Sequence, residues 1–495
     1  MTSPPVRRGP VRLPHLGGPG RRAGQYLLSV GETAADIVSS LAVLILVARA
    51  YGPPGLGTYS FLLSVYVILS YAAEMGVGKY VERELAGAGG PAGESLLAEA
   101  RGVVLLAGLL GGLAALALGS WATELESAAG GTGRGFWFLA AALPLNIYND
   151  LQIGVLHGRS MHAAASSLGL ARRLVLVLAV AFLSVLGAPP ETLTAGFVMS
   201  EGWAVLGAAR KVRLPSLTRV IRQRGGFSGT LRGGLRYYFT HEALRVLFFV
   251  DFFLLGFFVP AAESGAYAEA SVLTRLFLLV PLGIAPVFRV RIYGEAAGGR
   301  REVMAHCRRA AARVFTAHSV LALLFLLYFP RVLRMVFRVQ GDIPLSFQAF
   351  GILLPGLLYF SSVTILEPLY GVTGREDLLN RTVLRVVALN AVLNLYLIPY
   401  AGILGAAFAT SLSLAAYFVL FVRGPGGEAG IPLSSYLLSG GIVYAAYHAL
   451  KGARMPGPAL ALLAAAAIPV LFRLVGLYGE EKGGEGVNGG AGPGA

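Results

Sequence analysis

The sequence predicts an all-α, polytopic membrane protein with about 14 transmembrane helices. The composition is the first observation: 55% of the 495 residues are hydrophobic and 14% are charged, whereas soluble domains carry about 25% charged residues. The arrangement of the apolar residues is the second observation. The apolar residues form separate runs of roughly 18 to 24 residues, and about 20 helical residues cross a hydrocarbon core. The third is that most Arg residues lie between these runs.

The distribution of positive charge supports fourteen spans with both termini in the cytoplasm and the protein in the plasma membrane. The expected outer loops at 51–56, 187–191, 259–265 and 399–401 contain no Lys or Arg. Two other expected outer loops do contain basic residues and so depart from the rule that positive charge stays on the cytoplasmic side. One contains Arg331, Arg334 and Arg338, and the other contains Lys451 and Arg454. The expected spans are 27–50, 57–78, 97–119, 135–157, 168–187, 191–209, 237–258, 266–290, 310–329, 346–367, 380–399, 401–423, 433–450 and 457–477.

The longest cytoplasmic connection between spans separates the first six expected spans from the next six, and two further spans follow at the end of the chain. Gly57-Thr58-Tyr59 and Gly265-Ala266-Tyr267 open corresponding spans at a spacing of 208 residues, which predicts two pseudo-symmetric halves. Six is an even number, so both halves start inside, and such parallel repeats bind substrate between them. The expected organisation is a disordered basic cytoplasmic tail (1–25), an N-terminal six-helix half (26–210), a basic cytoplasmic linker (211–236), a C-terminal six-helix half (237–423), two extra transmembrane helices (424–478) and a Gly-rich tail (479–495).

The charge balance and the motifs exclude several function classes. The net charge of +15 would suggest nucleic acid in a soluble protein, but here the basic residues lie between apolar runs and indicate orientation and anionic headgroups. We therefore expect no nucleic-acid partner. The sequence has no Walker-type loop and no cluster with metal-ligand spacing, and its only cysteine is Cys307. We expect no catalytic residue, no metal and no cofactor, and hence no enzyme.

A polar face on the first expected span is the first candidate site. Ser29, Thr33, Asp36 and Ser40 share one helical face, and Glu32 lies beside it. A carboxylate near mid-bilayer is costly, so it indicates either a site for a coupling ion or a helix contact satisfied by neighbouring hydroxyls. Asp36 and Glu32 are the candidate ion-coupling residues.

The seventh and eighth expected spans carry the candidate residues for an anionic headgroup. Arg275 lies near mid-depth, and its guanidinium offers a planar fork of donors that suits a phosphate or pyrophosphate. Asp251 on the preceding span falls at a similar expected depth and could instead neutralise Arg275, so both interpretations remain open. His241 and Arg245 are neighbours on the inner half of the seventh span and suit a cytoplasmic entry point for the same headgroup.

The fourth expected span carries amide and carboxylate groups at helical spacing. Asn146, Asn149 and Asp150 form this group, and such side chains suit sugar hydroxyls. They are the candidate sugar-binding residues. Two further amides, Asn390 and Asn394 in the eleventh span, more plausibly pack between helices.

Three stretches resemble one family of membrane proteins. They are residues 47–86, the hairpin with Asp251, Gly265, Tyr267 and Pro286, and residues 389–418 with Asn390, Asn394, Pro399, Gly402 and Gly405. In this order they resemble polysaccharide-biosynthesis membrane proteins of the O-antigen flippase type, a polysaccharide transporter family. The resemblance covers about residues 25 to 423 and implies the fold of the multidrug/oligosaccharidyl-lipid/polysaccharide exporter superfamily. It also implies export of polyprenyl-(pyro)phosphate-linked oligosaccharide by alternating access.

Other functions compete with this expectation. An ion-coupled multidrug or cation antiporter of the same superfamily is the main alternative, because Asp36 would suit a cation. A glycosyltransferase or ligase ranks lower, since the outer loops are too short to form a domain, and a scaffold ranks last, since buried charges would then have no use. The expected partners are the lipid-linked glycan, membrane lipids and glycan-assembly enzymes.

Overall fold

The computed structural model describes residues 19–87, 91–124, 133–212, 214–216, 227–241, 243–295, 300–337, 343–452, 468–470 and 472, and within these ranges the secondary structure is helical. The all-α prediction is therefore confirmed. The helices are α1 (Pro19–Glu74), α2 (Val77–Gly87), α3 (Pro91–Glu124), α4 (Gly133–Gly158), α5 (His162–Val185), η1 (Pro190–Thr194), α6 (Ala195–Ala209), α8 (Phe227–His241), α9 (Ala243–Phe258), α10 (Ala261–Glu295), α11 (Arg300–Phe337), α12 (Ile343–Leu366), α13 (Leu369–Val372), α14 (Glu376–Phe421), η2 (Val422–Gly426) and α15 (Leu433–Gly452).

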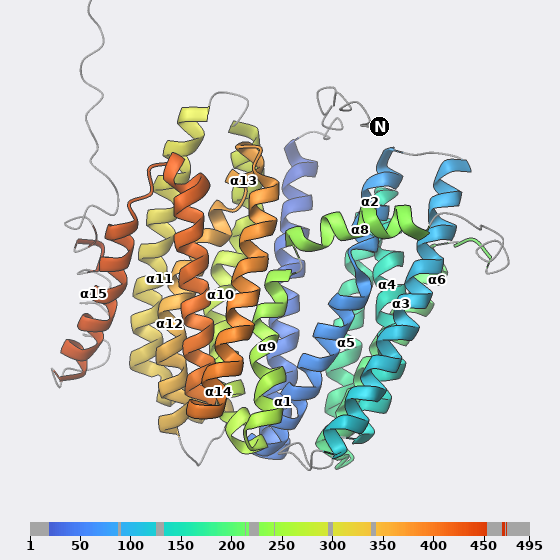
Figure 1. The fold of residues 1–495 in the computed structure, drawn as a ribbon, viewed down its shortest axis with the longest axis horizontal. Helices are drawn as coiled ribbons and strands as arrows, with labels where there is room; N and C mark the ends of the chain where they lie inside the picture. The colour runs from blue at the N-terminus through green and yellow to red at the C-terminus, as the bar shows by residue number, and fades with distance from the viewer. Residues whose placement is uncertain are drawn as a thin grey trace, which may run out of the picture.

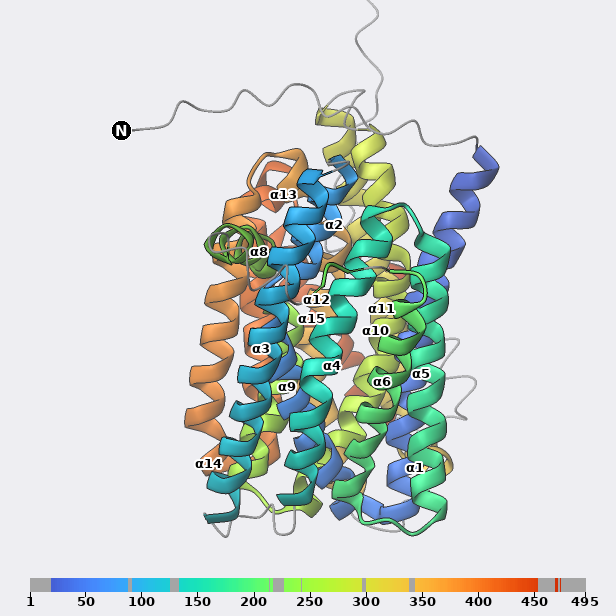
Figure 2. The same ribbon diagram turned by 90° about the vertical axis from the view of Figure 1, so that its right-hand side faces the viewer.

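The long helices stand side by side and form two groups. In Figure 1, α2 to α6 lie on one side and α10 to α15 on the other, with α1 and α9 between them. Figure 2 shows the N-terminal group, α3 to α6, facing the viewer. The helix α1 packs along α10 and α9, so the principal contact between the groups runs through it. The predicted boundaries of the halves stay a prediction, and most of the span 457–477 and of the tails lies outside the described residues.

The helices are long and apolar enough for a multi-pass membrane protein. Seven helical stretches in the described part meet the length and hydropathy that a span needs, and shorter apolar helices cover Val246–Phe258 and Leu433–Val443. Two of the seven, Ala35–Glu74 and Asp377–Gly426, contain a kink and thus hold two crossing segments each. The polytopic prediction is confirmed.

A glycine with a positive φ angle makes each of these kinks. Gly52 (φ 66°) turns α1 back on itself, and Pro53 and Pro54 follow it in the first turn of the second segment, where proline is tolerated. Gly402 (φ 52°) does the same in α14. The expected outer loops 51–56 and 399–401 are therefore tight helical corners. Both corners lie at the bottom of Figure 1, and we call this the kink end of the bundle.

At the kink end, the two groups of helices meet through glycines. A methyl group built on Gly57 of α1 would lie 1.9 Å from the carbonyl oxygen of Ala261, and one on Gly265 of α10 would lie 1.9 Å from the carbonyl oxygen of Pro53. Gly57 and Gly265 are 208 residues apart, and so are Pro53 and Ala261, so this reciprocal contact has the same spacing as the sequence repeat. Nearby, the Arg49 guanidinium donates to the carbonyls of Val336 (2.8 Å) and Met335 (3.2 Å) at the end of α11.

At the opposite end, the helix α8 crosses the bundle nearly at right angles to the long helices (Figure 1). It contacts α2 and α3 of the N-terminal group as well as α14 and α9. Thr230 donates to Oε2 of Glu99 at 3.1 Å, and Gly234 packs against the backbone of Met75. The predicted seventh span, 237–258, is therefore too long: its first residues, His241 included, belong to α8, and the span itself is α9.

Candidate functional site

A buried carboxylate organises a polar network in the N-terminal group. Glu201 of α6 is 4% exposed. Its Oε1 accepts hydrogen bonds from the Tyr66 hydroxyl (2.9 Å) and from Nδ2 of Asn146 (3.2 Å), while its Oε2 accepts one from Nδ2 of Asn149 (3.3 Å). These donors come from α1 and α4, so the carboxylate joins three helices. We call this set, with Arg172 and Asp150, the Glu201 network.

An arginine from α5 completes the Glu201 network. Nη1 of Arg172 lies 3.3 Å from both carboxylate oxygens of Glu201 and 3.9 Å from Oδ1 of Asp150. Because α5 begins at His162 and not near 168, Arg172 lies ten residues inside the helix, about 15 Å from its start. Arg172 is thus not only an orientation signal between spans. It is a partner of two carboxylates inside the bundle.

The predicted ion-coupling residue Asp36 lies beside this network. Its Oδ1 is 2.9 Å from Nε of Arg173, the residue after Arg172 on α5. The Asp36 side chain is 56% exposed, whereas Arg173 is 17% exposed. The structure therefore brings Asp36, Asn146, Asn149 and Asp150 to one region of the N-terminal group. The side chain of Glu32 lies outside the described part.

Replacing Glu201 with alanine should destabilise the fold strongly. The change leaves the charge of Arg172 and the donors of Tyr66, Asn146 and Asn149 without their shared acceptor, and breaking a buried pair in this way costs about 3–5 kcal/mol. The double variant Glu201→Leu/Arg172→Met should recover the part of the loss that comes from the unpaired Arg172 charge, because apolar replacement of both partners of a buried pair is tolerated. Recovery should be incomplete, because Tyr66, Asn146 and Asn149 still lack their acceptor. Thermal unfolding in detergent measures both changes. Glu82→Ala, which breaks only an exposed pair with Lys79, is the matched control, and an equal effect of the two alanine variants would contradict the prediction.

A second buried carboxylate organises a network in the C-terminal group. Asp251 of α9 is 2% exposed, and its Oδ2 accepts hydrogen bonds from the hydroxyls of Tyr267 and of Thr410 (2.6 Å). Its Oδ1 accepts one from Nδ2 of Asn394 (2.8 Å). Asn390 joins from the same helix as Asn394, donating to Oγ1 of Thr410 (3.0 Å) and accepting from Asn394 (3.1 Å). We call these five residues the Asp251 network.

The two networks differ in how their negative charge is balanced. Glu201 and Asp150 have Arg172 between them, whereas the partners recorded for Asp251 in the described part are all neutral. In addition, Oδ1 of Asn394 is buried with no hydrogen-bond partner. A buried carboxylate beside an unsatisfied carbonyl oxygen and two hydroxyls is an oxygen-rich environment that favours a cation or a proton.

The predicted headgroup residues lie on three different helices. The side chains of Arg275, Arg245 and His241 lie outside the described part, although their backbones belong to α10, α9 and α8. The helix α10 brings Tyr267 to Asp251, and Arg275 follows eight residues later, about 12 Å along the axis. Asp251 is therefore level with Tyr267 on α10, and both interpretations of Arg275 stay predictions.

Two buried carboxylates have hydrogen-bond partners that the sequence did not reveal. Glu201 lies in an apolar run with no polar neighbour at helical spacing, so nothing in the pattern points to its role as the centre of a network. Glu269 of α10 is 3% exposed and accepts a hydrogen bond from Oγ of Ser346 on α12 at 2.9 Å. The signal for both is the same: a single Glu inside a span, which is rare enough to require a partner.

Comparisons with known proteins identify the fold. No protein-family model matches the sequence, and no curated protein matches it. Among solved structures, the lipid II flippase MurJ in an inward closed conformation gives a TM-score of 0.69 at 13% identity, covering 91% of this chain and 98% of the flippase. An inward-facing multidrug resistance MATE family transporter of the MOP superfamily gives 0.62 at 16% identity, covering 81% and 94%. A eukaryotic MATE transporter gives 0.54 at 12% identity, covering 90% and 99%.

At these identities the comparisons show the fold. The chain has the fold shared by the lipid II flippase and by MATE transporters, over nearly its whole length. The resemblance found in the three sequence stretches is confirmed at this level. The solved proteins named above are transporters, which is consistent with the expectation of no enzyme.

Proposed function

We propose that the protein is an ion-coupled exporter that moves a polyprenyl-(pyro)phosphate-linked oligosaccharide across the plasma membrane by alternating access. The observation that carries the proposal is the fold, which matches a lipid II flippase over 91% of the chain. A lipid flippase needs a conformational cycle and a source of free energy. The structure offers one feature for each: a contact between two groups of helices, and a buried carboxylate with neutral partners.

The coupling ion binds at the Asp251 network in this proposal. A cation or proton there neutralises Asp251 and is held by Thr410, Tyr267 and the free carbonyl oxygen of Asn394. These groups come from α9, α10 and α14, so binding fixes the relative positions of three helices. Since α10 is also the main partner of α1, a shift of α10 on ion release changes the contact between the two groups. An ion can drive the cycle only through such differential binding.

The N-terminal network has a different role in the proposal. The amide donors of Asn146 and Asn149 already bind Glu201, so they position this carboxylate instead of reaching a sugar directly. Asp150 and Arg172 are 28% and 24% exposed, and they remain the groups that can meet sugar hydroxyls. The Asp36–Arg173 pair, with Glu32 nearby in sequence, is a second candidate for ion coupling, because releasing Arg173 would require a proton or cation at Asp36.

Arg275→Gln tests the lipid substrate. If Arg275 binds the (pyro)phosphate, the variant should lose co-purifying polyprenyl-phosphate-linked saccharide, by about tenfold or more, because a charge-assisted hydrogen bond contributes about 1.5–3 kcal/mol. Native mass spectrometry of the detergent-purified protein measures the bound lipid. Arg159→Gln, an exposed arginine in the turn between α4 and α5, is the control. Equal lipid retention in both variants would remove Arg275 from the proposed site.

The second candidate function is an ion-coupled multidrug or cation antiporter. The likeness to the MATE family transporter, with a TM-score of 0.62, favours it. The two functions differ in the substrate's charge, since an organic cation needs an acidic cavity and a pyrophosphate needs a basic one. Proteoliposomes that efflux a fluorescent organic cation under a sodium or proton gradient, with no lipid-linked saccharide in the purified protein, would favour the antiporter.

A further inference from the structure

A pocket between α10 and α11 contains charge that neither network uses. It has a volume of about 300 Å³ and is lined by Phe288 of α10 and by His306, Arg309, Ala310, Arg313 and Val314 of α11. Three of the six lining residues are basic and none is acidic. Positions 306, 309 and 313 recur at helical spacing, so they lie along one face of α11.

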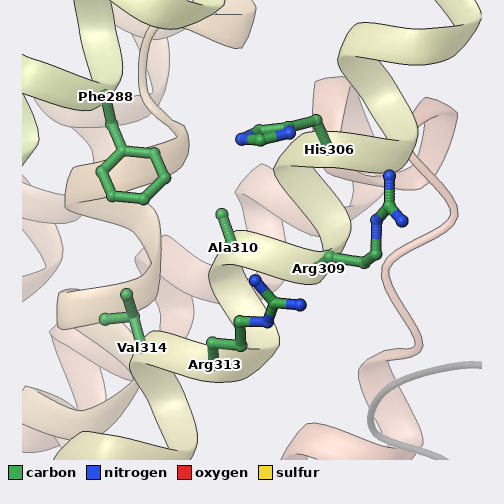
Figure 3. A pocket seen from close by; sticks show the side chains of 6 residues that line it. All are labelled: Phe288, His306, Arg309, Ala310, Arg313 and Val314. Atoms are coloured by element: carbon green, nitrogen blue, oxygen red, sulfur yellow. The ribbon is translucent and has the colours of Figure 1, made fainter.

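The pocket has an apolar side and a basic side. Figure 3 shows the Phe288 ring and Val314 on one side, while the Arg309 and Arg313 side chains extend to the other; the His306 ring points toward Phe288. Arg309 and Arg313 are exposed, and no hydrogen bond or ion pair is recorded for either among the described residues. Glu302, the nearest acidic residue before this face, is exposed one turn ahead of His306.

The position of the pocket relates it to the membrane. Phe288 precedes the end of α10 by seven residues, and Arg309 follows the start of α11 by nine, which places both about 10–14 Å from the helix ends. The helix α11 is one of the candidate spans, from Glu302 to Phe337. The expected span 310–329 begins between Arg309 and Arg313, so both arginines lie near the level of the lipid headgroups, and basic pockets between transmembrane helices bind lipid phosphates.

We propose that this pocket binds a phosphate-bearing lipid, with the phosphate held by Arg309 and Arg313 and the chain lying against Phe288 and Val314. His306 stands between the two sides and is the third group that faces the headgroup. The site is separate from the Asp251 and Glu201 networks and from Arg275, and it does not depend on what the protein exports. The phosphate can belong to an ordinary anionic phospholipid or to a polyprenyl phosphate, since both present the same group.

The test is competitive lipid binding followed by native mass spectrometry. The purified full-length protein is titrated with phosphatidylglycerol, phosphatidylcholine or undecaprenyl phosphate. We expect the wild type to prefer phosphatidylglycerol over phosphatidylcholine, and Arg309→Gln/Arg313→Gln to reduce binding of phosphatidylglycerol by roughly 30-fold, as two surface charges predict. Displacement of phosphatidylglycerol by undecaprenyl phosphate in the wild type would identify the polyprenyl lipid as the preferred source; no displacement would identify the phospholipid.

The control is the double variant Arg331→Gln/Arg334→Gln at the other end of α11. It removes the same two charges from two exposed positions of the same helix, so it measures nonspecific attraction. An equal loss of lipid in both double variants, or no headgroup preference in the wild type, would overturn the proposal. Because Arg309 and Arg313 are exposed, we expect the thermal unfolding of the variant to match that of the wild type, which separates lost binding from lost folding.

Discussion

Replacing Asp251 with asparagine should abolish the ion dependence of both stability and transport. Asparagine keeps the size of the side chain and loses its negative charge, while the partners Tyr267, Thr410 and Asn394 stay in place. A cation at about 100 times its Kd stabilises the folded protein by about 2.7 kcal/mol, and the variant should lose this contribution. We expect ion-driven transport to fall by at least about 100-fold. Without the carboxylate, the ion no longer binds one conformation more tightly than the other, so it cannot shift the conformational equilibrium.

The measurement is thermal unfolding of the purified protein in sodium chloride against choline chloride at equal ionic strength, repeated over a range of pH. If sodium raises the unfolding temperature of the wild type and not of the variant, the site binds sodium. If the two proteins respond alike to sodium and differ only in how their unfolding temperature depends on pH, the site binds a proton. Glu269→Gln is the matched control, since it neutralises another buried carboxylate that binds only Ser346 in the described part. If Asp251→Asn keeps the full response to sodium and to pH, the coupling site lies elsewhere, and Asp36 becomes the first residue to test.

The fold was accessible from the sequence because membrane spans are a matter of length and hydropathy. Apolar runs of about 20 residues and the distribution of arginine were enough to predict an all-α, multi-pass protein. Boundaries were less accessible. The sequence predicted loops at Gly52 and Gly402, where the structure has helical corners. A glycine with a positive φ angle can bend a helix without a separate loop, and the sequence pattern does not distinguish the two. The start of α8 inside an expected linker was also missed, because a helix that lies across the bundle has no long apolar run.

The site was only partly accessible, because buried charges find partners through tertiary contacts. Asn146, Asn149 and Asp150 were expected to act together. The structure brings the two amides to the Glu201 carboxylate, and Asp150 joins them through Arg172, which lies between the two carboxylates. The common partner of the two amides, Glu201, lies more than 50 residues away in the chain, so no local spacing could reveal it. Asn390 and Asn394 were expected to pack between helices. They do so, but as partners of Asp251 and Thr410, which makes them part of a candidate ion site.

Substituting the reciprocal glycines should open the kink end of the bundle. A methyl group at Gly57 or Gly265 would meet a backbone carbonyl at 1.9 Å, and backbone atoms cannot rotate away as a side chain can. The helices α1 and α10 must therefore move apart, and overpacking of this kind costs about 1–3 kcal/mol. In an alternating-access protein the cost falls on the state that is closed at this end. We expect Gly57→Ala and Gly265→Ala each to lower the population of that state by roughly 5- to 150-fold relative to the open one.

Distances between spin labels across the kink end measure this shift. Val185 at the end of α5 and Tyr400 at the corner of α14 are 86% and 81% exposed, so cysteines there can be labelled, while the native Cys307 is buried. Gly351→Ala in α12 is the control, because nothing lies within 4 Å of its added methyl group and it carries the same gain in helix propensity. The two interface variants should populate a longer distance that the control does not. Unchanged distances in both would mean that the glycine contact persists through the cycle and that the groups of helices separate around another axis.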